Sequence, residues 1–247
     1  MNKRKIDINC DVGEGIGNEP DLFPMISSCN IACGGHAGSK ETIRQCLELA
    51  LKFNVSIGAH PSYPDRENFG RISMDISDDD LIRSISDQMK LFMIECNYLG
   101  ATLHHIKPHG ALYNDIAKNQ HLAKVFLSAI IRYKKNVVLY VPFGSIIEKL
   151  AIASNFKIWR EAFADRNYTN DLNLVSRKQK NALISNGKDV LNHLLLMYNE
   201  KEVRTVNGER IPIQADTFCI HGDTPTAFQI LMYITEHLSE YNLQAKP

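Results

Sequence analysis

The chain opens with a short alternation of apolar and polar residues that is typical of a β-strand. Across residues 5–9, Ile6 and Ile8 fall on one face, whereas Asp7 and Asn9 fall on the other. A polar face on a first strand needs water or hydrogen-bonding partners. The mouth of a barrel supplies both, so the pattern favours a strand whose polar side points into a barrel.

Six further short runs along the chain predict strands, and each is rich in apolar residues or alternates in strand fashion. They lie at residues 29–33, 55–59, 102–107, 137–141, 157–161 and 216–220.

Amphipathic helical patterns separate these strands. Apolar residues recur at i, i+3, i+4, i+7 and i+8 through residues 43–51, and Ser39 is placed to cap that helix. Ser77, followed by Asp80, opens a second helix that ends near Gly100. Further helices are predicted over 112–133, from the capping box at 145–148, over 190–198, and after Thr224-Pro225, with Pro at the first helical position.

Seven alternations of strand and helix predict an α/β barrel of seven or eight units rather than a doubly wound sheet. A chain of 247 residues is near the usual size of one such barrel, so we expect a single domain over residues 1–247. The Asn-Gly pair within residues 203–208 predicts a small inserted β-hairpin. Two long connections, at 61–74 and 164–177, are expected to be binding loops.

Composition excludes several functional classes. Lys and Arg total 28 and so do Asp and Glu, so no net field favours nucleic acid or an anionic membrane. No apolar run approaches the roughly 20 residues of a membrane span. The opening Met-Asn-Lys-Arg-Lys leads into polar residues without a signal-peptide core, which predicts a cytoplasmic protein.

The six cysteines do not form a recognisable zinc or disulfide framework. Cys29 and Cys33 are four apart, but no second pair completes a metal site, and most are expected to be buried apolar residues. Cys33, next to Gly34-Gly35-His36, is a weaker candidate for a nucleophile.

Four polar clusters next to Gly or Pro follow predicted strands, so folding is expected to gather them at one barrel mouth. They are Asn-Cys-Asp-Val-Gly-Glu-Gly at 9–15, Gly-Ala-His-Pro at 58–61, Lys-Pro-His-Gly at 107–110 and His-Gly-Asp at 221–223. A reactive side chain at a bent backbone, repeated four times, indicates an enzyme.

The first cluster places Asp11 and Glu14 in a glycine-rich turn. Asp11 shares the polar strand face, and we expect it at a strand end outside the core. The alternate glycines resemble a phosphate-cradling loop, but the sequence lacks the Gly-Lys-Ser/Thr ending of a P-loop. The alternative is a flexible turn with solvated acids.

Four histidines near strand ends, His36, His60, His109 and His221, favour convergence on one site. Imidazole suits proton transfer near neutral pH and equally suits a divalent metal. No His-Glu-x-x-His signature is present, so whether a metal binds stays open.

Cationic residues complete the candidate set. Lys107 ends a strand and would stabilise a phosphate or an oxyanion, or pair with Asp7 or Asp11 inside the barrel. Asp165-Arg166 places a carboxylate beside a guanidinium, and the guanidinium fork matches carboxylate or phosphate. Arg66, Arg71 and Arg177 are alternatives that equally fit a solvated surface.

At these blocks the chain resembles the LamB/YcsF family. Further matching blocks are Asn-Ile-Ala-Cys-Gly at 30–34, His-Ala-Gly at 36–38, Phe-Gly-Arg at 69–71, Lys-Pro-His-Gly-Ala-Leu-Tyr-Asn at 107–114, Phe-Ala-Asp-Arg at 163–166 and His-Gly-Asp-Thr-Pro at 221–225. They run in order over nearly the full length. Two departures, Gly35 for the usual Phe and Ser39-Lys40 for Asp-Pro, are expected to loosen the packing or the helix cap next to His36.

The resemblance implies ATP-dependent opening of 5-oxoproline (pyroglutamate) to L-glutamate, performed with partner subunits B and C and with ATP, as its Mg²⁺ complex, as co-substrate. It also implies a barrel of the glycoside hydrolase/deacetylase type, a class associated with carbohydrate metabolism. For this chemistry the candidate catalytic residues are Asp11, Glu14, His60, Lys107 and His109. The candidate substrate- or phosphate-binding residues are His36, Arg71, Asp165, Arg166, His221 and Asp223.

Two other functions fit the same residues. The first is a stand-alone metal-dependent hydrolase related to deacetylases, suggested by the set of His and Asp residues. The second is a non-catalytic assembly subunit of an enzyme whose active site lies elsewhere.

Overall fold

A closed barrel of seven parallel strands forms the centre of the protein in this computed structural model, which describes residues 3–245. Met1 and Asn2, part of the opening segment considered above, lie outside the described residues. The barrel strands follow the order β10-β2-β3-β4-β5-β6-β7, and β7 closes on β10. They are β2 (Ile8–Val12), β3 (Ser28–Ala32), β4 (Ser56–His60), β5 (Leu103–Ile106), β6 (Val138–Pro142), β7 (Lys157–Phe163) and β10 (Thr217–Ile220).

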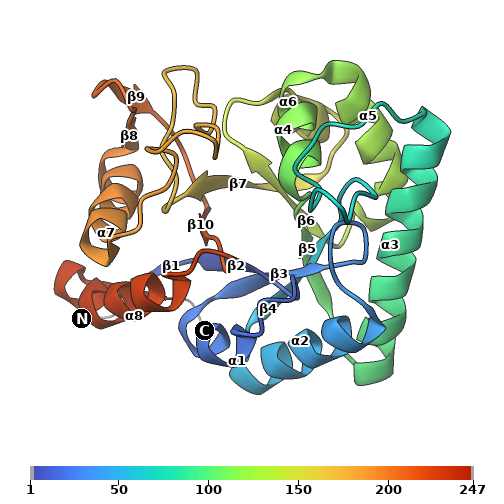
Figure 1. Ribbon diagram of the computed structural model, residues 1–247, viewed down its shortest axis with the longest axis horizontal. Helices are drawn as coiled ribbons and strands as arrows, with labels where there is room; N and C mark the ends of the chain where they lie inside the picture. The colour runs from blue at the N-terminus through green and yellow to red at the C-terminus, as the bar shows by residue number, and fades with distance from the viewer. Residues whose placement is uncertain (1–2, 246–247) are drawn as a thin grey trace.

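Helices form an outer layer around the barrel (Figure 1). They are α1 (Glu19–Leu22), α2 (Lys40–Phe53), α3 (Asp78–Leu99), α4 (Gly110–Lys118), α5 (Gln120–Ala129), α6 (Ile146–Ala153), α7 (Gly187–Leu195) and α8 (Ala227–His237). Short 3₁₀ turns lie at Phe23–Met25, Ile131–Tyr133 and Leu238–Tyr241, and a π-helical turn lies at Leu196–Glu200. The expected α/β barrel of seven or eight units is confirmed, and it has seven strands. Among the described residues no helix is both long enough and apolar enough to cross a membrane.

Strand β2 is buried on both faces, because one side packs under helices and the other fills the barrel. The expected first strand, 5–9, is interrupted at Asp7. Before it, β1 (Arg4–Ile6) pairs with β11 (Leu243–Ala245), and after it β2 joins the barrel. The Asp7 carboxylate accepts hydrogen bonds from Ser28 (2.8 Å) and Thr217 (2.6 Å), so this polar side chain is anchored inside the protein rather than solvated.

Local capping explains where most helices begin. Ser39 and Thr42 form a reciprocal capping box on α2, and the Ser77 hydroxyl accepts the Asp80 amide of α3. The expected helix at 112–133 divides at Asn119, whose extended backbone ends α4 while its side chain caps α5. The closing helix does not start at Thr224-Pro225, because Thr224 instead accepts the Ala227 amide in a preceding turn.

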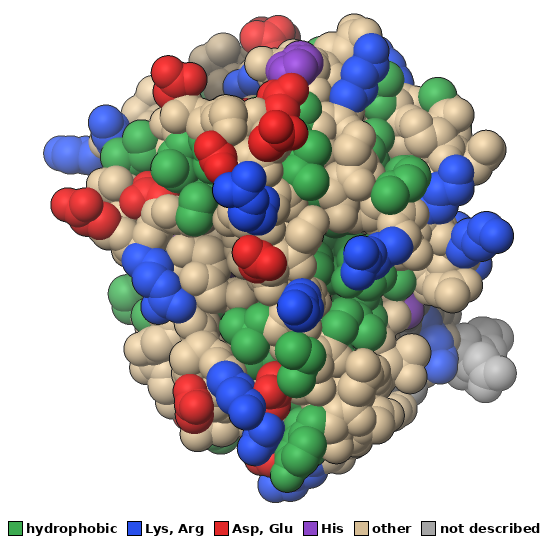
Figure 2. Space-filling view, turned by 90° about the vertical axis from the view of Figure 1, so that its right-hand side faces the viewer, with side chains coloured by type: hydrophobic (Ala, Val, Ile, Leu, Met, Phe, Trp, Pro, Cys, Tyr) green, Lys and Arg blue, Asp and Glu red, His purple; other side chains and the backbone are tan. Residues whose placement is uncertain are grey.

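The expected hairpin is present as β8 (Glu202–Arg204) and β9 (Arg210–Pro212). Its connection is longer than a two-residue turn, with Gly208 at a φ of +85° near the end. On the face shown in Figure 2, acidic and basic side chains are interspersed, with small groups of hydrophobic side chains between them. This distribution agrees with the balanced charge of the sequence.

Candidate active site

The candidate site lies at the carboxyl ends of the barrel strands, where a cavity of about 820 Å³ opens. Asp11 is the second-last residue of β2, His60 ends β4, and Lys107 directly follows β5. Both long loops contribute to the wall, as expected: residues 71–73 come from the first loop, and residues 173–178 come from the second and the turn after it.

Lys107 is the central cation of the site and is 2% exposed. Its Nζ lies 2.8 Å from Asp11 Oδ1, 3.0 Å from Glu161 Oε1 and 3.1 Å from Cys219 Sγ. Burial alone would lower the pKa of Lys107, but these partners raise it well above its usual range. The ammonium is therefore a fixed positive charge. The expected ion pair inside the barrel forms with Asp11, while Glu161 was not among the predicted residues.

Asp11 is buried in a dense set of polar contacts. Besides Lys107, its carboxylate accepts a hydrogen bond from Asn30 Nδ2 at 2.7 Å and lies 3.5 Å from His60 Nε2. Burial would raise the pKa of Asp11, but Lys107 and His60 hold it well below its usual range. The expectation that Asp11 lies outside the core is wrong, because a barrel buries the ends of its strands under the loops.

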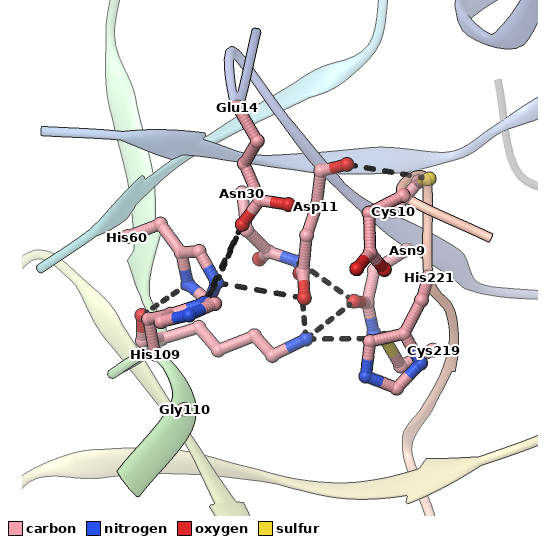
Figure 3. Close-up of polar contacts among 12 residues, drawn as sticks. Asn9, Cys10, Asp11, Glu14, Asn30, His60, His109, Gly110, Cys219 and His221 are labelled. Atoms are coloured by element: carbon pink, nitrogen blue, oxygen red, sulfur yellow. Dashed lines mark hydrogen bonds and ion pairs between the residues drawn. The ribbon is translucent and has the colours of Figure 1, made fainter. Parts of the chain in front are cut away.

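His60 and His109 lie next to each other on one side of Asp11 (Figure 3), with His60 Nε2 2.9 Å from His109 Nδ1. The other ring nitrogens contact backbone carbonyl oxygens: His60 Nδ1 lies 2.7 Å from Lys107 O, and His109 Nε2 lies 3.0 Å from Phe69 O. A carbonyl oxygen only accepts, so these two nitrogens carry hydrogens. Burial, together with His36 and His60, lowers the pKa of His109 well below its usual value.

Glu14 and His36 complete this group. Glu14 Oε1 lies 3.1 Å from His36 Nε2 and 3.4 Å from His109 Nδ1. Burial, reinforced by Asp11 and Asp223, raises the pKa of Glu14 well above its usual value. Burial also lowers the pKa of His36 to about 2. The glycine-rich turn thus positions a carboxyl group at the site, and Gly13 N–H donates to Glu19 at 3.1 Å rather than to an anion in the cavity.

Three of the four predicted histidines converge, and the fourth lies apart. Figure 3 shows Asp11 between His60 on one side and His221 with Cys219 on the other. The Asp165 carboxylate accepts the His221 amide at 2.9 Å and lies 3.0 Å from its Nδ1. Asp165 therefore orients His221 from behind and does not line the cavity.

The remaining charged candidates lie around the cavity rim. Asp223 forms ion pairs with Arg71 and, at 3.2 Å, with Arg177. Arg166 lines the cavity, but its Nε and Nη2 donate to the carbonyls of Ala182 and Val175. Arg166 therefore holds the second loop in place, and its expected grip on a substrate is restricted by these bonds.

Sequence reasoning missed the polar layer below the site. Asn30 donates to both Asn9 Oδ1 and Asp11 Oδ1 at 2.7 Å, and its own amide oxygen lies 2.8 Å from His105 Nε2. Period-two spacing places Asn9 with Asp11, and His105 with Lys107, on the inward faces of their strands. This spacing is the feature of the sequence that could have identified Asn9 and His105 as neighbours of the site.

Two other expectations are corrected by the packing. Cys33 is buried, its Sγ donates to Ile31 O, and burial raises its pKa, so it is not an activated nucleophile. The cap next to His36 is not loosened, because Ser39 forms the capping box described above. Nor is Gly35 in a loose region, since a Cβ there would meet Ser62 Oγ at 2.4 Å and Gln88 Oε1 at 2.5 Å.

The sequence profile of the LamB/YcsF family matches residues 6–247. The chain belongs to the LamB/YcsF family. It is 36% identical to the A subunit of 5-oxoprolinase from Haemophilus influenzae (strain PittEE) over 98% of both chains, and 40% identical to that of Bacillus cereus (strain ATCC 10987 / NRS 248) over 91% of both. Its fold is similar to that of the lactam utilization protein from Thermus thermophilus. That match has a TM-score of 0.91 and 30% identity, and it covers 98% of this chain and 99% of the other.

In this LamB/YcsF protein, three of the blocks that resemble the family meet at the cavity. The family blocks at 9–15, 58–61 and 107–114 contribute Asp11, His60 and Lys107 to the cavity wall. The family resemblance seen in the sequence is thus confirmed over nearly the whole chain, and its blocks form one buried polar site.

Proposed function

We propose that this protein is the A subunit of an ATP-dependent 5-oxoprolinase, which hydrolyses 5-oxoproline to L-glutamate together with subunits B and C. The observation that carries the proposal is similarity over 98% of the chain to relatives named as the A subunit of 5-oxoprolinase. The whole of residues 1–247 acts as one barrel domain in this proposal.

The chemistry of the cavity suits the opening of a lactam. A lactam is a poor electrophile at neutral pH, so transfer of a phosphoryl group from ATP to its oxygen, which releases ADP, makes the carbonyl carbon more electrophilic. Attack of water on that carbon then lets the C–N bond break, with a proton delivered to the nitrogen. A second water hydrolyses the resulting acyl phosphate to L-glutamate and phosphate. Lys107 is placed to stabilise the negative charge on the oxygen, because it is a buried and permanently charged cation. Asp11, Glu14, His60 and His109 supply groups that hold and transfer protons beside it.

Cations at the rim suit an anionic substrate. Arg71, Arg177 and Lys178 line the same cavity, and only part of their charge is offset by Asp223. A substrate carboxylate or a phosphate bound there would replace the Asp223 carboxylate as a partner of these cations. His36, Asp165, Arg166 and His221 support this wall rather than bind substrate at its centre.

ATP, with Mg²⁺, is a co-substrate in this proposal and requires surfaces from the partner subunits. The sequence carries no P-loop and no kinase-type glycine loop followed by its lysine. We place the assembled enzyme in the cytoplasm, where its ATP would be available.

The deciding experiment measures 5-oxoproline turnover by the isolated chain and then with subunits B and C and ATP. We expect little activity alone and strong activity in the mixture. Asp11→Asn and Lys107→Met should each abolish turnover of the mixture. Lys124→Ala, which removes an exposed lysine of α5 outside the cavity lining, is the control and should retain activity.

Stability must be followed in the same variants. Removing one partner of a buried ion pair costs about 3–5 kcal/mol, so Lys107→Met is expected to lower the melting temperature as well as the rate. Full turnover by a folded Asp11→Asn or Lys107→Met variant in the mixture would show that the chain serves assembly only. Robust ATP-dependent turnover without partners would contradict the proposed division of labour.

A further inference from the structure

The arrangement of protons on His60 and His109 constrains what can lie between the two rings. Each ring uses one N–H to bond a backbone carbonyl, so in the neutral rings His60 Nε2 and His109 Nδ1 both present lone pairs. These two nitrogens are 2.9 Å apart. Two lone pairs repel at this distance unless a cation or a proton lies between them.

A shared proton would create an imidazolium in a region where burial disfavours charge. A metal ion would instead bind both lone pairs. Metal-ligating histidines almost always donate their other ring N–H to a carbonyl or carboxylate, which fixes the tautomer and the ring orientation. His60 and His109 already have this second set of bonds.

A carboxylate oxygen lies beside these two nitrogens, and a third imidazole contacts that oxygen. Glu14 Oε1 lies 3.4 Å from His109 Nδ1 and 4.0 Å from His60 Nε2, and His36 Nε2 lies 3.1 Å from Glu14 Oε1. Ligands about 2.0–2.1 Å from one zinc ion lie roughly 2.9–3.4 Å apart at right or tetrahedral angles. The separations of 3.4, 3.1 and 2.9 Å fall within that range. Only the 4.0 Å between Glu14 Oε1 and His60 Nε2 exceeds it, and this pair requires a wider angle at the metal.

The surrounding chain encloses this group tightly. All four side chains are buried, and their ligand atoms lie within 4.8 Å of one another. The first long loop lies against them: Phe69 contacts the rings of His36 and His109, and a Cβ on Gly70 would come within 2.9 Å of His36. His60 and His109 also line the cavity, so one side of the group faces it.

We propose that Glu14, His60 and His109 bind one divalent transition-metal ion, while the His36 ring stacks on that of His109, with ring centroids 3.6 Å apart, and contacts Glu14. A donor set of imidazoles with one carboxylate favours zinc, cobalt, nickel or iron over magnesium or calcium. The ion would have an open position toward the cavity for water or for the lactam carbonyl oxygen, as in hydrolytic metal sites. The catalytic use of this position rests on the proposed function, whereas metal binding does not.

A second group of metal-ligating residue types consists of Asp11, Cys219 and His221. Cys219 and His221 lie on the side of Asp11 that faces away from His60. Lys107 Nζ contacts both Asp11 and Cys219 there, so a cation already occupies the space between these two side chains. We therefore assign the metal to Glu14, His60 and His109 alone.

The test uses the purified full-length chain, stripped with a chelator and then titrated with Zn²⁺ or Co²⁺. We expect one ion per chain by elemental analysis and a visible Co²⁺ spectrum of a nitrogen- and oxygen-ligated ion. Glu14→Gln, His60→Ala and His109→Ala should each weaken binding at least tenfold. His221→Ala and the exposed His121→Ala should leave it unchanged.

Circular dichroism and melting curves identify any variant that fails to fold. If the alanine variants fail to fold, the near-isosteric Glu14→Gln variant still provides the test. Absence of stoichiometric metal in the folded wild-type chain, or full binding by folded Glu14→Gln and His109→Ala variants, would overturn the proposal and assign a shared proton to the pair. Because this measurement needs neither ATP nor partners, its failure is distinguishable from failure of the 5-oxoprolinase proposal.

Discussion

At the scale of single residues, the site depends on buried charges that stabilise one another. Lys107 keeps its proton because Asp11 and Glu161 contact it, and Asp11 keeps its charge because Lys107 and Asn30 contact it. Removing water strengthens these electrostatic interactions and makes a missing partner costly. The same residues are therefore expected to matter for both folding and activity.

The Asp165–His221 contact predicts a specific dependence of stability on pH. Burial would raise the pKa of Asp165, but the His221 ring and amide hold it below its usual value. A carboxyl group with a depressed folded-state pKa stabilises the protein above its unfolded pKa, near about 4, and this stabilisation is lost as the pH falls through the folded value. Asp165→Asn should cost about 1.5–3 kcal/mol at pH 7.

Urea unfolding at several pH values measures this effect. The difference in unfolding free energy between wild type and Asp165→Asn should shrink as the pH is lowered below about 4. The exposed Asp87→Asn variant serves as the control and should show only a small difference throughout. A difference that stays constant with pH would contradict the assigned role of the carboxylate.

At the scale of elements, β4 and β5 approach each other closely at Gly58. A Cβ on Gly58 would lie 2.0 Å from His105 Nε2, the atom that contacts Asn30 and so supports Asp11. The register of the two strands shifts at this point, between Ile57 and Gly58. The glycine thus makes room for the polar layer under the site.

Gly58→Ala is expected to destabilise the protein by about 1–3 kcal/mol, the usual cost of overpacking a buried position. It should also reduce turnover by displacing His105. The double variant Gly58→Ala/His105→Ala removes the overlap. Its loss of unfolding free energy should therefore be smaller than the sum of the losses in the two single variants. Strict additivity in thermal or urea unfolding would show that the two side chains do not meet.

At the scale of the whole molecule, the barrel and its helices shield all six cysteines. Burial raises the pKa of Cys29 to about 12 and also raises the pKa of Cys219, despite the lysine beside it. We expect fewer than one thiol per native chain to react with a thiol reagent, and all six to react after denaturation.

Leu51→Cys places a thiol at an exposed position of α2 and provides the positive control, with one fast-reacting group. The native cysteines should react only at the rate of global unfolding, measured from the same sample by circular dichroism. Fast reaction of a native thiol would contradict the closed barrel at that position.

The amino-acid sequence by itself determined the repeated strand and helix order, most caps, and the family blocks that carry Asp11, His60, Lys107 and His109. Period-two and period-3.6 patterns are local, so they identify elements and inward faces without any knowledge of the fold. The sequence also placed the candidate residues at strand ends, where a parallel barrel must bring them together.

Only the tertiary structure decided which of these residues meet. Glu161, Asn30 and Cys219 come from three different strands, and nothing local indicates that they contact Lys107 or Asp11. The same is true of the separation of His221 from the other three histidines. Contacts between strands far apart in sequence depend on barrel closure and register, and the direction of each pKa shift depends on the burial that this closure creates.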